Sequence, residues 1–132
     1  MSHETSITVR FSDLDPYDHV NHARYLTYFE SARIEMLDAI GYGMTEMKRS
    51  GFHIVLVEVT VHFHAAAGLH DLLTITTDLL DIGRASTTWR QEARVGDRLI
   101  ADLEARAAFT DQHGRPIRPP QGFAAAVAGG VA

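Results

Sequence analysis

The amino-acid sequence predicts an α+β fold in which a five-stranded antiparallel sheet wraps around one long helix. Apolar and polar residues alternate in five separate stretches, which is typical of strands with one buried face because successive side chains point to opposite sides. Between the first two stretches the apolar residues instead recur at the spacing of an amphipathic helix. One helix and five strands must bury their apolar faces against one another, so we expect the sheet to curve around the helix.

The five strand-like stretches cover most of the chain outside the helical pattern. They lie at residues 7–11, 57–64, 73–79, 88–93 and 99–110. Short glycine-containing links join the last three, namely Gly83-Arg84 and "VGDR" at 95–98. Because such short links join antiparallel neighbours, the last three strands are expected to lie side by side.

The helical pattern follows residue 21 and covers about four to five turns. Its apolar face is made of Tyr25, Leu26, Phe29, Ala32, Met36, Leu37, Ala39 and Ile40. Asn21 is a candidate N-cap, and Gly41 and Gly43 suit a left-handed turn at the C-terminal end.

The domain is predicted to end near residue 115. Residues 1–115 hold all the strands and the helix, whereas 116–132 read "PIRPPQGFAAAVAGGVA", a Pro-rich run followed by an Ala/Gly-rich one. Low-complexity termini of this kind are often poorly ordered, so we expect this tail to fray.

Composition excludes several classes of function. The formal net charge of −5 is unlike that of nucleic-acid binders, which neutralise phosphates with basic patches. The chain has no cysteine, so thiolate metal sites and cysteine nucleophiles are ruled out. No stretch reads as a signal peptide or a membrane span, and a cytoplasmic location without membrane partners is the expectation.

The densest chemistry lies at residues 13–22, "DLDPYDHVNH", just before the helix. With its surroundings, "VRFSDLDPYDHVNHARYLTYFESAR" and the later "HDLLTIT", this run resembles the 4-hydroxybenzoyl-CoA thioesterase group of the hotdog superfamily. The resemblance covers roughly residues 5–112 and is closest to the long-chain acyl-CoA thioesterase branch. It implies a hotdog fold, a homodimer or homotetramer with sites between subunits, an acyl-CoA substrate, and neither metal nor cofactor.

The resemblance assigns catalytic roles to Asp15, His19 and Asn21. A carboxylate can act on a thioester as general base for water or as nucleophile, while amides at the helix N-terminus stabilise the oxyanion. His19 would polarise the carbonyl or orient water, and Asn21 would hold Asp15. The structural alternatives are a turn role for Asp15 before Pro16 and helix capping for Asn21.

Three further residues are candidates for substrate binding. Tyr25 lies one helical turn after Asn21 and would line the acyl pocket, unless it only packs in the core. Arg84 and Ser86 occupy the link where relatives place groups that contact CoA, and a guanidinium matches phosphate geometry.

The chain departs from its relatives at two places. Asp18 replaces a glycine that many relatives carry, and we expect its charge to point outward because it would otherwise repel the developing oxyanion. After the second strand, relatives often carry an arginine and a proline, whereas this chain has "HFHAAAG". His62 and His64 there are either metal ligands or part of a polar sheet face. Asp13 is expected to be a solvated carboxylate.

Two other functions stay open besides acyl-CoA hydrolysis, and the departures at Asp18 and "HFHAAAG" favour the second of them. One is a thioesterase that acts on acyl-carrier protein, and the other is a non-catalytic module that binds acyl groups, since one fold can host several functions.

Overall fold

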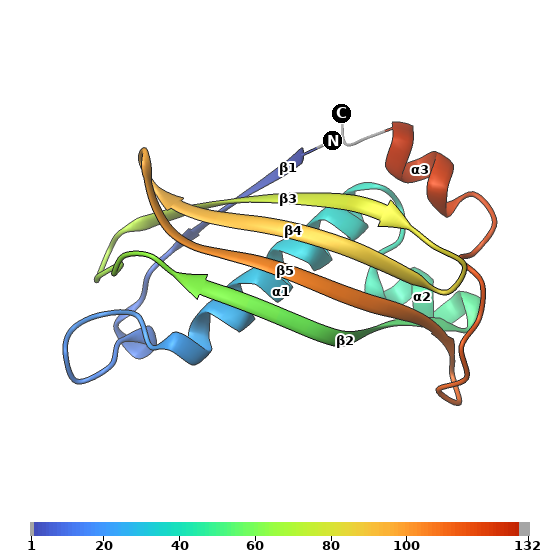
Figure 1. Ribbon diagram of the computed structural model, residues 1–132, viewed down its shortest axis with the longest axis horizontal. Coiled ribbons are helices and arrows are strands. Elements are labelled where there is room, and N and C mark those ends of the chain that lie inside the picture. The colour runs from blue at the N-terminus through green and yellow to red at the C-terminus, as the bar shows by residue number, and fades with distance from the viewer. Residues whose placement is uncertain (1, 130–132) are drawn as a thin grey trace.

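Five antiparallel strands form one sheet in the order β1-β3-β4-β5-β2 in the computed structural model, which describes residues 2–129 (Figure 1). The strands are β1 (Ser2–Thr8), β2 (Phe52–Phe63), β3 (Leu72–Ile82), β4 (Ser86–Val95) and β5 (Arg98–Asp111). The last three are consecutive antiparallel neighbours, which confirms the prediction from their short links.

The helix α1 (His22–Ala39) lies across one face of this sheet (Figure 1). Its buried residues are Tyr25, Tyr28, Phe29, Ala32, Met36 and Leu37. This stripe confirms most of the predicted apolar face, but Leu26 is 44% exposed while Tyr28 is buried in its place. Tyr28 follows Tyr25 by three residues and therefore shares its face, whereas Leu26 is turned by about 100° from Tyr25.

A buried polar network joins α1 to the sheet at Gln91. Its amide nitrogen donates to the carbonyl of Phe29 (2.9 Å) and to Oγ1 of Thr77 (2.9 Å), and its oxygen accepts from Arg33 (2.8 Å). All the polar atoms of this fully buried side chain are thereby satisfied, which is what burial of an amide requires.

The first strand begins and ends earlier in the chain than its apolar alternation predicts. β1 ends at Thr8, and Phe11, expected on the buried face, is 80% exposed in the short 3-10 turn η1 (Phe11–Asp13). The reason is that Val9 exchanges hydrogen bonds with the loop after β2, donating to Asp71 and accepting from His70. The backbone then turns toward α1 instead of continuing along β3.

β2 is an edge strand, because only β5 pairs with it. The predicted alternation is interrupted by a bulge between Leu56 and Glu58, and Val55, Leu56, Val57 and Phe63 are all more than two fifths exposed. Apolar side chains on an unpaired edge are a typical surface for pairing with another strand.

The C-terminal segment differs from the frayed tail that its composition predicts. Residues Phe123–Gly129 form the helix α3 against the end of the sheet that also carries α2 (Met44–Ser50). Phe123 is fully buried, with its ring edge-on to Phe109 (centroids 5.2 Å apart) and Tyr42 (5.1 Å). One large aromatic residue thus docks a segment that otherwise reads as low complexity; residues 130–132 lie outside the described part.

No helix between residues 2 and 129 has the length and apolar character needed to cross a bilayer.

Candidate active site

The loop before α1 is closed by its own backbone. Leu14 and Val20 form an antiparallel bridge, and the amide of Asp15 donates to the carbonyl of His19 (2.7 Å). Asp18 adopts a left-handed conformation with φ of 62°. This explains why glycine suits the position, since few residues other than glycine, asparagine and aspartate adopt this conformation at low cost. The Asp18 side chain is exposed, as predicted.

The Asp15 carboxylate is held through one of its two oxygens. Oδ1 accepts hydrogen bonds from the amides of Tyr17 (2.8 Å) and His19 (3.2 Å). Asp15 therefore stabilises the turn around Pro16, as the structural alternative predicts. Oδ2 has no donor within residues 2–129 and is available to a substrate or a water molecule.

Asn21 caps α1, which confirms the structural alternative proposed for it. Its Oδ1 accepts from the amide of Ala23 (2.9 Å), and its carbonyl accepts from Arg24. The amides of Val20 and Asn21 donate to Ala67 and Asp13. The neighbouring amides at the start of α1 thus all have acceptors. In the described part of the chain, the amide of His22, by contrast, donates to none.

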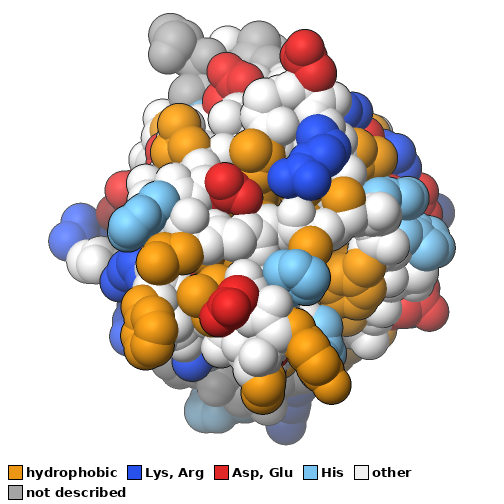
Figure 2. Space-filling model, turned by 90° about the vertical axis from the view of Figure 1, so that its left-hand side faces the viewer, with side chains coloured by type: hydrophobic (Ala, Val, Ile, Leu, Met, Phe, Trp, Pro, Cys, Tyr) orange, Lys and Arg blue, Asp and Glu red, His pale blue; other side chains and the backbone are white. Residues whose placement is uncertain are grey.

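Asp15, His19 and Tyr25 line one open cavity of about 380 Å³. The other lining residues are Val20, His22, Phe63, His64, Ala65 and Ala66. This end of the molecule mixes hydrophobic side chains with histidines and acidic groups (Figure 2). The structure thus brings together three of the six predicted site residues. Asn21 caps α1 and is not among the residues that line the cavity.

Tyr25 packs in the core and also lines the cavity. It is buried, packs edge-on against Tyr28 (5.9 Å) and Phe63 (5.5 Å), and also lines the cavity. Burial raises the pKa of its hydroxyl, so Tyr25 presents a neutral phenol.

Arg84 and Ser86 lie at the other end of the sheet. Arg84 is exposed in the turn between β3 and β4, and Ser86 pairs with Ala108 close to the start of β2. The cavity is lined instead by residues around the start of α1, which lies at the opposite end of the sheet from the turn between β3 and β4 (Figure 1). Within one chain, these two residues are not part of the Asp15 cavity.

Asp13 is buried, and the prediction that it is solvated is wrong. Its carboxylate accepts from the Tyr28 hydroxyl (2.7 Å) and from the amide of Arg10 (3.2 Å), and Arg24 lies 3.9 Å away. Burial, followed by this hydrogen bond to Asp13, raises the pKa of Tyr28 well above its ordinary value. The pair fixes the entry of α1, and no local sequence signal reveals it because Tyr28 is fifteen residues away.

The loop 64–71 supplies site residues that the sequence analysis does not predict. His64, Ala65 and Ala66 line the cavity, and the carbonyl of Ala67 accepts the amide of Val20 (2.9 Å). His62 and His64 both contact Asp102, and no group of three possible ligands in residues 2–129 is arranged to hold a metal ion.

Comparison with known proteins identifies the family. The model of the thioesterase-like superfamily matches residues 9–127. The chain is 37% identical over 86 residues to the long-chain acyl-CoA thioesterase FadM of Escherichia coli, over 63% of this chain and 62% of FadM. It is 38% identical over 120 residues to the chloroplastic acyl-acyl carrier protein thioesterase ATL3 of Arabidopsis thaliana, over 89% of this chain and 63% of ATL3. The matched part is thus less than two thirds of either relative.

Solved structures agree with this result. A probable thioesterase from Bartonella henselae superposes with a TM-score of 0.87 at 28% identity, covering 91% of this chain and 100% of that chain. The fold predicted from the sequence, a hotdog sheet around one long helix, is therefore confirmed. Because the family model covers nearly the whole chain, this protein belongs to the thioesterase-like superfamily.

Proposed function

We propose that this protein hydrolyses acyl-CoA thioesters to the free acid and CoA. The observation that carries the proposal is the Asp15 carboxylate, which is fixed through Oδ1 and has Oδ2 free, in a cavity shared with His19 and Tyr25. Membership of a thioesterase family and the likeness to FadM support a CoA substrate.

The chemistry of a thioester suits this small set of groups. Asp15 acts as general base on water or as nucleophile, and His19 at the mouth of the cavity orients the carbonyl or the water. The free amide of His22, at the positive end of the helix dipole, is the group we assign to the developing oxyanion. A thiolate leaving group has a pKa of about 8.5, so it departs without strong acid assistance.

A carrier-protein substrate is the second candidate, because the chain is also similar to the acyl-carrier protein thioesterase ATL3. Both substrates present the same thioester, and they differ in the group beyond the sulfur. The Asp15 cavity alone does not distinguish them.

Thiol release from a panel of substrates tests the function. We expect purified protein to release free thiol from at least one class of short, long or aromatic acyl-CoA, with a higher kcat/KM than for the same acyl group on carrier protein. A preference for carrier protein would favour the second candidate. Acyl-CoA binding without turnover would contradict both and leave a non-catalytic acyl-binding module.

We also propose that the protein is a homo-oligomer that pairs through the β2 edge. Antiparallel pairing of two β2 strands would place the Phe63 end of one copy beside the Phe52 end of the other. The Phe52 end is the one near Ser86 and Arg84, so a second copy could complete the site with the binding residues that one chain keeps apart.

The variant Val57→Lys tests this pairing. Val57 is 51% exposed on β2, and a charge on an edge strand opposes strand pairing. We expect the molar mass from light scattering to fall from that of a multimer to that of a single chain. His113→Lys, at an exposed position in the turn after β5 and outside β2, is the matched control. A wild-type monomer would contradict the proposal.

A further inference from the structure

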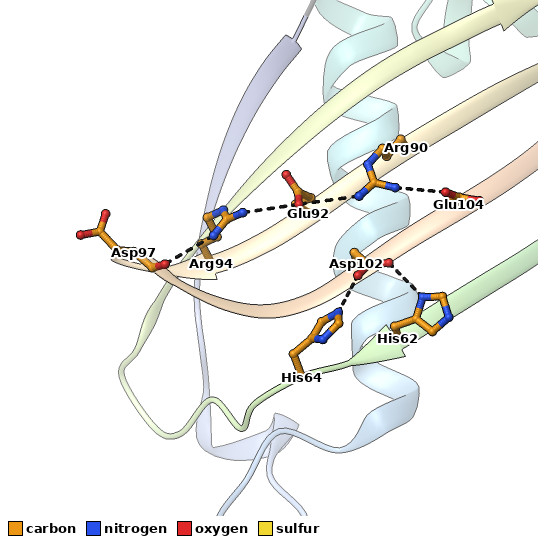
Figure 3. Close-up of polar contacts among 8 residues, drawn as sticks. All are labelled: His62, His64, Arg90, Glu92, Arg94, Asp97, Asp102 and Glu104. Atoms are coloured by element: carbon orange, nitrogen blue, oxygen red, sulfur yellow. Dashed lines mark hydrogen bonds and ion pairs between the residues drawn. The ribbon is translucent and has the colours of Figure 1, made fainter.

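Asp102 lies between His62 and His64 (Figure 3), and His64 is also one of the residues that line the Asp15 cavity. Its Oδ1 is 3.1 Å from Nδ1 of His62, and its Oδ2 is 2.6 Å from Nε2 of His64. The Asp102 side chain is only 13% exposed, whereas those of His62 and His64 are 63% and 43% exposed. Burial alone raises the pKa of Asp102, but the hydrogen bonds from His64 and His62 outweigh it and leave that pKa below its ordinary value.

The two histidines differ in what their rings face. His62 pairs directly across from Asp102 on the outer face of the sheet, and it does not line the cavity. His64 follows the end of β2, where its amide donates to the carbonyl of Ile100 (2.8 Å), and it is one of the residues that line the cavity with Asp15 and His19. His64 is therefore the member of the cluster that can meet a substrate.

Asp102 also determines which nitrogen of His64 acts as a base. A carboxylate accepts a hydrogen bond, so Nε2 carries the proton and Nδ1 of the neutral ring is left as the acceptor. Within residues 2–129, Nδ1 has no hydrogen-bond partner. A carboxylate that orients a histidine base in this way is a recurrent arrangement in hydrolases.

Asp15 is better arranged as a nucleophile than as a base. Its carboxylate is anchored by two amides through Oδ1, which fixes Oδ2 as an attacking atom. Histidine is the side chain that most often serves as a general base in enzymes. A covalent intermediate formed on Asp15 would need a separate base to activate water.

We propose that His64, oriented by Asp102, is a catalytic residue that takes the proton of the hydrolytic water, while Asp15 carries the acyl group. This rests on the proposed thioesterase function and selects between the two roles left open for Asp15. Asp102 is a positioning residue, since it acts through His64.

The steps balance as follows for an acyl thioester. Oδ2 of Asp15 bonds to the acyl carbon, the carbon–sulfur bond breaks, and the thiolate leaves with its electron pair. Water then bonds to the acyl carbon of the mixed anhydride while Nδ1 of His64 takes one water proton. The anhydride bond breaks, Asp15 returns as carboxylate, and the proton on His64 passes to the thiolate or to solvent.

The variant His64→Gln separates the two half-reactions. Glutamine keeps a donor for Asp102 but cannot accept a proton, so we expect steady-state turnover to fall by at least about a hundredfold. His64→Gln should still release one equivalent of thiol per site in a rapid burst. Mass spectrometry of the quenched protein should then show the acyl group on the peptide that holds Asp15. Asp15→Asn should show neither the burst nor the acyl adduct. His113→Gln, at an exposed position in the turn after β5, is the control and should turn over like wild type.

The burst of thiol release tests the role of Asp102. In Asp102→Asn, the amide can donate to Nε2 of His64, which favours the tautomer with the proton on Nδ1 and removes the base. Steady-state turnover should therefore fall, whereas the rapid equivalent of thiol per site should remain. Steady-state turnover that matches wild type would overturn the positioning role.

The outcomes separate this inference from the function on which it rests. A wild type that releases no thiol from any acyl-CoA or acyl-carrier protein overturns both. If wild type turns over and His64→Gln turns over equally well, only the role of His64 is overturned. The same holds if His64→Gln is slow but shows neither a burst of thiol nor an acyl adduct. An equal loss in His62→Gln would also overturn it, because His62 does not line the cavity.

Discussion

Asp15→Asn is expected to lower kcat/KM for the best acyl-CoA by about a thousandfold, or about 4 kcal/mol in transition-state stabilisation. The amide keeps an oxygen that can accept from Tyr17 and His19, so the loop should hold its shape. What is lost is the negative charge at Oδ2, whether it acts as base or as nucleophile. Thiol-release kinetics measure the loss, and an unchanged urea-unfolding midpoint would show that it is chemical.

Asp18→Asn is the matched control for that experiment. Asp18 lies in the same loop, is exposed, and has φ of 62°, a conformation that asparagine also tolerates. Its variant should retain wild-type activity. Equal activity in Asp15→Asn and wild type would mean that another group supplies the charge and that the proposed site is wrong.

Phe123→Ala should reduce the free energy of unfolding by about 3–5 kcal/mol, the usual cost of deleting a buried aromatic ring. The ring is fully buried and contacts Phe109 and Tyr42, so its removal leaves a cavity where α3 docks. Urea unfolding measures the change through a shift of the midpoint.

Ala125→Ser, at an exposed position of α3, is the control and should change stability by less than about 0.5 kcal/mol. A loss of less than about 1 kcal/mol in Phe123→Ala would be small for a buried aromatic. It would mean that the C-terminal segment is frayed, as its composition predicts.

The contrast between the two ends of the chain shows how far local patterns reach. The alternation in β3 and β4 places Leu73, Ile75, Trp89 and Ala93 on the buried face, and the structure agrees, because strand periodicity is a property of the backbone itself. For the tail after residue 115, composition predicts fraying, and that prediction is wrong for Phe123–Gly129, which form α3. Whether this alanine-rich segment docks or frays depends on the contacts of Phe123 with Phe109 and Tyr42, which lie well before it in the sequence.

The same division holds within the candidate site. The sequence by itself determined the fold, the start of α1 with Asn21 as its cap, and the loop that presents Asp15, since these follow from periodicity and short-range hydrogen bonds. Only the tertiary structure decided that Asp13 is buried under Tyr28, that His64 with Asp102 borders the cavity, and that Arg84 lies far from it. The last two placements depend on strand order and register, whereas the contact of Asp13 with Tyr28 depends on how the loop before α1 folds back on the helix. No local sequence pattern encodes either of them.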